Sequence, residues 1–173
     1  LAVLQGKDDA DRVLDCALPL AARFSAHLVG VHAEPIPVPY VTPMGFPDTD
    51  FIAASAEMNQ QRSNELKALF EARAGREGVA CEWHALESVS GDSAIGALAA
   101  ARACDLVVVQ QSDPEGASGS LANVEALLFE SGRPVLFVPF AVSVDPAFSR
   151  VLVAWNGTQQ AARAAFDALP FIR

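Results

Sequence analysis

The run Asp105-Leu-Val-Val-Val109 constrains the fold of this chain more than any other feature. Its four consecutive apolar residues, three of them β-branched valines, favour a short strand. A strand with apolar side chains on both sides is expected only in a sheet whose two faces are both covered. The run therefore predicts a sheet that lies inside the protein between layers of helices.

Apolar strand patterns alternate with helical patterns along the first 139 residues. Strands are predicted at residues 1–5, 27–33, 79–86, 105–109 and 134–139. Helices are predicted between them, at about 10–21, 49–75, 90–103 and 121–128. This order predicts a parallel sheet with right-handed crossovers and helices on both faces. We therefore expect an α/β fold with a doubly wound, Rossmann-like sheet of five strands.

The stretch Glu34–Pro47 breaks this alternation. It holds five prolines and Gly45, a composition that can continue neither a helix nor a sheet ladder. We predict a loop here. Loops of this length are often lids or partner contacts.

The composition limits the class of protein and its partners. Hydrophobic residues make up 51% of the chain and charged residues 19%, which is enough apolar content for a folded core. The net charge is -9, which argues against nucleic acid and anionic membranes as partners. No apolar run approaches the roughly 20 residues that span a bilayer.

The cysteines and the first residues bear on the cellular compartment. Cys16, Cys81 and Cys104 are odd in number and have apolar neighbours, so we expect reduced residues in the core. The chain does not open with a basic stretch followed by an apolar segment. These observations predict a cytoplasmic protein.

The segment Gly157–Pro170 repeats Gly6–Pro19 at an offset of 151 residues. Six of the fourteen positions are identical, including a proline inside the predicted helix. We therefore predict that residues 1–139 are one domain, that 140–149 are a linker, and that 150–173 are the first strand and helix of an incomplete second copy. The alternative is that two alanine-rich units resemble each other by composition. The apolar faces of 150–173 would be covered by the first domain, by another copy, or by further residues.

Residues Cys104–Gln110 and Gly132–Pro139 resemble the end of a universal stress protein domain. The Gln5-Gly6 turn and the alanine-rich helix after it resemble the opening of the same domain, so the resemblance covers residues 1–139. Residues 150–173 resemble a second opening, as in tandem members. The resemblance implies strand order 3-2-1-4-5 and a cytosolic stress-response role. It also implies homodimer or tandem pseudo-dimer contact through the fifth strand, at Val135, Leu136, Phe137 and Val138.

Some members of that family bind ATP, and this chain departs from their motifs. Those members carry an aspartate at the end of the first strand, where this sequence has Gln5, and Asn156 in the second copy. Their glycine-rich phosphate loop begins where this sequence has Gln110, and its Gly-Ser pair falls on Leu121-Ala122. We therefore expect no cofactor in this half of the protein.

The residues expected at the ligand position of this fold class also argue against a bound nucleotide. A doubly wound sheet binds ligands beyond the carboxyl ends of its strands, at the switch point between the first and fourth strands. The candidate crevice residues are Gln5, Gly6, Lys7, Gln110, Ser112, Gly116, Gly119 and Ser120. Lys7 is the only cation of these two loops, against four acidic residues, which disfavours a triphosphate. His32 is the histidine closest to this crevice, and we expect it to be hydrogen-bonded within the structure.

We find no sequence signature of an enzyme. Gly116-Ala-Ser118-Gly119 differs from a nucleophile elbow because its second glycine comes one residue early. The preferred hypothesis is a non-enzymatic stress-response domain that acts by dimerisation or partner binding. The main alternative is an ATP-binding member with a divergent phosphate loop. A nucleotide hydrolase or flavoprotein subunit of similar fold is a third, more distant, possibility.

Overall fold

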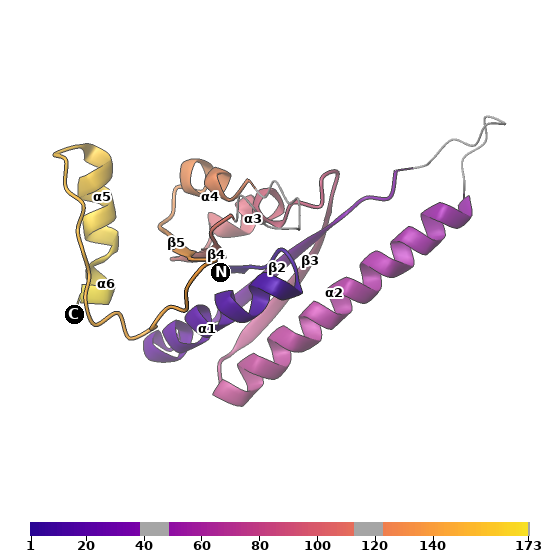
Figure 1. Ribbon diagram of the computed structural model, residues 1–173, viewed down its shortest axis with the longest axis horizontal. Helices are drawn as coiled ribbons and strands as arrows, with labels where there is room; N and C mark the ends of the chain where they lie inside the picture. Colours follow the sequence, from indigo (N-terminus) through magenta and orange to yellow (C-terminus); the bar gives the residue numbers. More distant parts are fainter. Residues whose placement is uncertain (39–48, 113–122, 173) are drawn as a thin grey trace.

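The computed structural model describes residues 1–38, 49–112 and 123–172 (Figure 1). Its centre is a five-stranded sheet of order β3-β2-β1-β4-β5, in which every neighbouring pair is parallel. The strands are β1 (Ala2–Val3), β2 (Leu28–Pro35), β3 (Cys81–Ser88), β4 (Val107–Gln110) and β5 (Val135–Val138). The predicted α/β class, strand number and strand order are confirmed.

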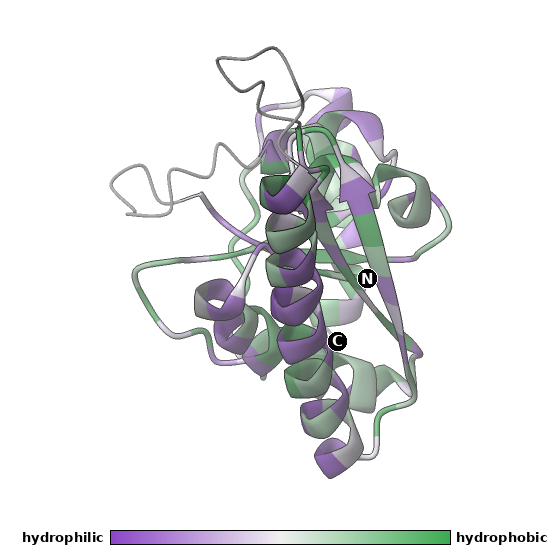
Figure 2. Cartoon of the chain, turned by 90° about the vertical axis from the view of Figure 1, so that its right-hand side faces the viewer, coloured by the Kyte–Doolittle hydropathy of each residue, from purple (hydrophilic) through white to green (hydrophobic). Residues whose placement is uncertain are grey.

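Helices cover both faces of the sheet, as Figure 1 shows. One face carries α1 (Lys7–Phe24) and α2 (Thr49–Glu77), and the other carries α3 (Ser93–Ala101) and α4 (Val124–Glu130). Beyond β5 follow α5 (Gln159–Asp167) and the short α6 (Leu169–Ile172). Figure 2 shows that α2 presents many hydrophilic residues to the viewer. It buries only Ser63, Leu66, Phe70 and Ala74.

The first four residues of the chain join the two layers of the core. Ala2 and Leu4 belong to a cluster with α1 and α2, whereas Leu1 and Val3 belong to a cluster with α3 and α4. All four residues are buried. The central strand is thus apolar on both sides because both sides are covered.

Besides small shifts at the ends of other elements, two predictions differ from the structure. β2 extends through Glu34 to Pro35, two residues into the predicted loop, because β3 pairs with it as far as Ser88. The rest of that loop falls largely on residues 39–48, outside the described residues. The predicted strand at 151–155 is not formed, since these residues pair with no other strand of the described chain. A strand needs a neighbour to satisfy its backbone groups. The helix predicted after it is present as α5.

The described residues contain no helix that is both long and apolar enough to cross a bilayer. All three cysteines are free thiols, as predicted. Cys16 is buried, while Cys81 and Cys104 are half-buried. Burial raises the pKa of the Cys16 thiol to about 11.

Candidate functional site

A cavity of about 440 Å³ opens at the carboxyl ends of β1 and β2. Its wall is built by the β1–α1 turn, the end of β2, the middle of α2 and the turn before α3. The residues are Gln5–Lys7, His32–Pro35, Arg62, Glu65, Leu66, Ser90 and Gly91. The site is therefore polar, with charged side chains of both signs.

The cavity lies to one side of the position that the fold class predicts. Gln5, Gly6 and Lys7 line it as expected, but Gln110 and Ser112 do not. Gly116, Gly119 and Ser120 lie outside the described residues. The prediction of a single crevice between β1 and β4, lined by both loops, stays a prediction, because residues 113–122 of the second loop lie outside the described residues. The Oε1 atom of Gln110 is buried and has no hydrogen-bond partner among the described residues.

Asp92 is the centre of a hydrogen-bond network at the start of α3. Its buried carboxylate caps α3 by accepting a hydrogen bond from the backbone N–H of Ala94 at 2.9 Å. The other carboxylate oxygen accepts bonds from the backbone N–H and the side-chain amide of Asn123, at 2.9 and 3.1 Å. Because Asn123 caps α4, Asp92 joins the starts of two helices at the switch point of the sheet.

Gln5 belongs to the same network. Its side-chain Nε2 donates to Asp92 over 3.4 Å, and its Oε1 accepts from the backbone N–H of Ser93 at 3.2 Å. The Ser93 hydroxyl in turn accepts from the backbone N–H of Ala33 at 2.9 Å. These bonds tie the end of β1 to β2 and α3, so the Gln5 amide is already used within the protein.

Asp9 stabilises the β1–α1 turn through hydrogen bonds from the backbone of the turn. Its carboxylate accepts from the backbone N–H groups of Gln5 at 2.9 Å and Gly6 at 2.7 Å. Burial raises the pKa of Asp9, and the two hydrogen bonds oppose that shift. These two backbone amides of the turn are therefore already bonded to a carboxylate.

His32 and Glu34 form a buried polar pair on β2, and Arg62 of α2 covers it. His32 Nδ1 lies 2.9 Å from the carbonyl oxygen of Leu4, which can only accept, so this nitrogen donates. Its Nε2 lies 3.1 Å from Glu34 Oε1. Arg62 binds both Glu34 oxygens, with Nε at 3.1 Å and Nη2 at 2.6 Å. The predicted structural role of His32 is confirmed. The bonds to Glu34 raise the pKa of Arg62.

The sequence predictions missed Arg62, Glu65 and the second role of Asp92. Arg62 lies four residues before the buried Leu66 on α2, but its own side chain is 56% exposed, so the spacing alone did not mark it as a site residue. Asp92 falls at the start of the helix that the sequence predicts at about 90–103. No spacing along the chain indicated that Asn123, 31 residues later, would share its carboxylate.

Residues 1–139 match the family described as Usp, Universal stress protein family. The chain belongs to this family. A solved structure titled as a universal stress protein family member from Burkholderia pseudomallei is 30% identical, covers 80% of this chain and 93% of its own, and has a TM-score of 0.53. A universal stress protein from Archaeoglobus fulgidus is 19% identical, with 79% and 94% coverage and a TM-score of 0.48. The search of curated proteins found no match.

No cluster of three or more His, Cys, Asp or Glu side chains suited to a metal ion occurs in the part of this universal stress domain that the structure describes. His32 and Glu34 are adjacent to Arg62 rather than to further ligands of that kind. The cavity thus offers hydrogen-bonding groups and charge.

Proposed function

We propose that this universal stress domain acts in a cytoplasmic stress response by binding another protein chain, without catalysis and without ATP at the β1–β4 switch point. The observation that carries the proposal is the Asp92 carboxylate at that switch point, bound to the Asn123 amide. The three free thiols suit the reducing cytoplasm.

Polyphosphates bind to free backbone amides at helix starts, helped by cations. Here the amides of Gly6 and Asn123 are bonded to the carboxylates of Asp9 and Asp92, at 2.7 and 2.9 Å. A phosphate group would have to displace these carboxylates and then remain near their negative charge. These two hydrogen-bonded carboxylates support the proposal that the switch point does not bind ATP.

The edge strand β5 favours association with another chain. Its neighbour β4 donates backbone bonds to the carbonyls of Pro134 and Val138, so the alternate residues Val135 and Phe137 turn their backbone groups to the free edge. The side chains of both residues are half-buried. In α4, which precedes β5, Phe129 is 79% exposed. An apolar edge strand of this kind can pair with a strand of another chain.

Association through β5 can be tested by sedimentation velocity with two variants at one position. Phe137→Pro removes an N–H group that faces the free edge, whereas the matched Phe137→Ala variant loses the same ring contacts but keeps the N–H. We expect Phe137→Pro to weaken self-association at least tenfold relative to Phe137→Ala, with circular dichroism confirming that both fold. Equal association of the two variants, or a monomeric wild type at all concentrations, would contradict pairing between copies through β5.

Nucleotide binding can be tested by calorimetric titration of ATP with Mg²⁺ into the full chain. We expect no saturable heat. Saturable binding in the micromolar range would contradict the ATP part of the proposal. The association through β5 is tested independently of this result.

The second candidate function is nucleotide binding with a divergent phosphate loop. It is favoured by the 440 Å³ cavity beside Lys7 and Arg62, and by the unpartnered Oε1 of Gln110 among the described residues. On this hypothesis Lys7→Met would weaken ATP binding severalfold, because it removes a cation from the cavity wall. The exposed Lys67, outside the cavity, provides the matched Lys67→Met control.

A further inference from the structure

The segment 150–172 contains a helix that is formed but not covered. Thr158 caps α5 through its hydroxyl oxygen, which accepts from the backbone N–H of Ala161 at 3.3 Å. The same hydroxyl donates to Asn156 Oδ1 at 2.6 Å, so the cap is built from within the segment. No residue of α5 or α6 is buried. The helix therefore has its own start signal, while its residues are at most half-buried within the described chain.

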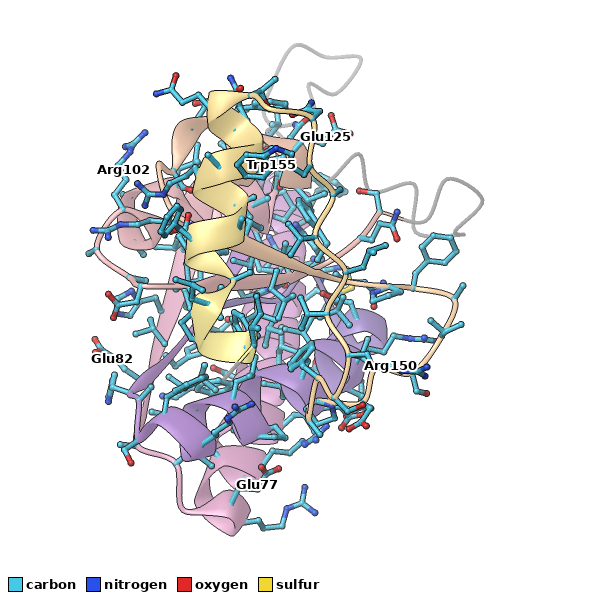
Figure 3. The ribbon with its side chains drawn as sticks, turned by 90° about the vertical axis from the view of Figure 1, so that its left-hand side faces the viewer. Glu77, Glu82, Arg102, Glu125, Arg150 and Trp155 are labelled. Atoms are coloured by element: carbon cyan, nitrogen blue, oxygen red, sulfur yellow. The ribbon has the colours of Figure 1, made fainter. Side chains whose placement is uncertain are left out.

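One ring anchors this segment to the domain. Phe171 of α6 lies 6.3 Å from the ring of Phe24 and 5.4 Å from that of Phe148. Figure 3 shows α5 and the labelled Trp155 standing in front of the rest of the chain from this side. Phe148 and Phe171 pack against the buried cluster of α1 and α2, whereas no residue of α5 belongs to either core cluster.

The internal repeat identifies which side of α5 is built for burial. In α1 the residues that contact the core are Ala10, Val13, Leu14, Ala17, Leu18 and Ala21, each at most 5% exposed. At the offset of 151 these positions hold Ala161, Ala164, Ala165, Ala168, Leu169 and Ile172. Every one is apolar. In contrast, the exposed Arg12 corresponds to the exposed Arg163. The repeat therefore preserves the division between a core side and a solvent side.

The residues before α5 carry the sequence of a central strand. Val151–Trp155 is apolar at every position, as is Leu1–Leu4, which is buried on both sides between β2 and β4. Leu152 is 95% exposed and Trp155 63% exposed. An edge strand with one face in water would alternate polar and apolar residues. This run instead requires a strand on each side and a covering layer on each face.

The sheet of residues 1–139 cannot supply those neighbours, because β1 already occupies the position between β2 and β4. If residues 151–155 took the place of β1 in a second copy of the chain, the displaced β1 would become exposed. Such an exchange would therefore bury no additional strand. We propose that residues 150–172 are the first strand and helix of a second universal stress fold. They dock in a parallel sheet whose β2-like and β4-like strands come from outside residues 1–139. This inference rests on family membership and the repeat, and is independent of the proposed function.

The test supplies the missing strands. Because residue 173 corresponds to residue 22, the full chain is extended at Arg173 with a second copy of its own residues 23–139. We expect a second cooperative unfolding transition. We also expect the backbone amides of 151–156 to exchange with deuterium on the order of 100-fold more slowly than in the 173-residue chain. A control chain carries a complete copy of 1–139 after residue 149 and shows that the added half folds in that place.

Two matched variants of the extended chain make the result specific. Ala165→Asp changes the position that corresponds to the buried Leu14, and we expect it to abolish the protection of 151–156. Ala162→Asp makes the same change where α1 carries the exposed Asp11, and we expect the protection to remain. The proposal is overturned if the control folds while 151–156 stay unprotected, or if both variants behave alike. Protection that appears in the unextended chain as its concentration rises would assign the surface to a second copy and also overturn it.

Discussion

Asp92 and Asn123, on different helix caps, are joined at the switch point of the sheet by a 2.9 Å hydrogen bond from the Asn123 backbone N–H to the Asp92 carboxylate. The Asn123 side-chain amide donates to the same oxygen at 3.1 Å. Two donors of the residue that precedes α4 therefore share one carboxylate oxygen of the residue that caps α3. This arrangement places a carboxylate that already has hydrogen-bond partners at the switch point, where a doubly wound sheet usually binds its ligand.

The substitution Asp92→Asn tests this connection. One carbonyl oxygen can still cap α3 at Ala94, but the new amide group would face the donors of Asn123. We expect a loss of about 1–3 kcal/mol in unfolding free energy because a buried donor loses its acceptor. Urea unfolding measures this loss. The control is Asp145→Asn, where an exposed carboxylate accepts from Ala147 at 3.0 Å and the change should stay within about 0.5 kcal/mol. Similar losses for both variants would argue against a structural role for the Asp92–Asn123 pair.

The substitution Arg62→Met tests the polar wall of the cavity. Arg62 binds both oxygens of Glu34, whose side chain is 9% exposed, so its removal leaves a buried carboxylate with His32 as its remaining partner. We expect a loss of about 1–3 kcal/mol in unfolding free energy, measured by urea titration. Lys67→Met removes an exposed ion pair with Glu71 from the same helix and should cost no more than about 0.5 kcal/mol.

A double-mutant cycle completes the Arg62 test. If Glu34→Gln is made first, Arg62→Met should cost much less, because no buried charge is left behind. An unchanged cost in the Glu34→Gln background would show that Arg62 stabilises the fold through packing of its aliphatic stem instead.

The fold was predictable from the sequence because local patterns and burial agree in residues 1–139. Strands such as β4 are short apolar runs bounded by polar residues, and helices such as α1 have clear spacing and an acidic first turn. The strand predicted at 151–155 does not form, and the reason is physical. Its sequence has the composition of a buried strand, but a strand forms only where neighbours bind its backbone.

The candidate site was predictable only in part. The β1–α1 turn belongs to the site because its position at the carboxyl edge follows from the fold, and Gln5, Gly6 and Lys7 were found there. The opposite wall of the cavity depends on which side chain of α2 contacts β2. No local sequence pattern encodes that contact. The Arg62–Glu34 contact joins residues 28 apart in the sequence, and it becomes visible only once the helix is docked.

Because of Cys16, we expect the unfolding free energy of this domain to depend on pH in the alkaline range. Burial raises the pKa of its thiol from an ordinary 9.0 to about 11, so the unfolded chain loses this proton at a lower pH than the folded chain. The resulting stabilisation is fully present below about pH 9 and is lost as the pH rises toward 11. We expect the unfolding free energy of wild type to fall more steeply from pH 9 to 11 than that of Cys16→Ala. The difference should be on the order of 1 kcal/mol per pH unit. Parallel curves for the two proteins would contradict a buried neutral thiol.

Substitutions at Gly91 and Gly78 distinguish two ways in which replacing a glycine lowers stability, namely backbone strain and steric overlap of the new Cβ atom. Both have a positive φ, of 67°, which strains any residue with a Cβ atom. A Cβ on Gly78 would meet nothing within 4 Å, whereas one on Gly91 would lie 2.8 Å from the backbone nitrogen of Pro35. Gly78→Ala should therefore cost about 1 kcal/mol in unfolding free energy. Gly91→Ala should cost at least about 2 kcal/mol, because the end of β2 must also move.

The same pair of variants reports on the cavity, because Gly91 and Pro35 both line it and Gly78 does not. A shift of Pro35 would displace the neighbouring Glu34 from Arg62, so Gly91→Ala should also reduce the cost of a subsequent Arg62→Met substitution. Gly78→Ala should leave that cost unchanged, since the two sites are independent. Urea unfolding of the wild type, the three single variants and the two double variants measures both effects. Equal costs for the two glycine substitutions would mean that the turn before α3 can move away from Pro35 without disturbing β2.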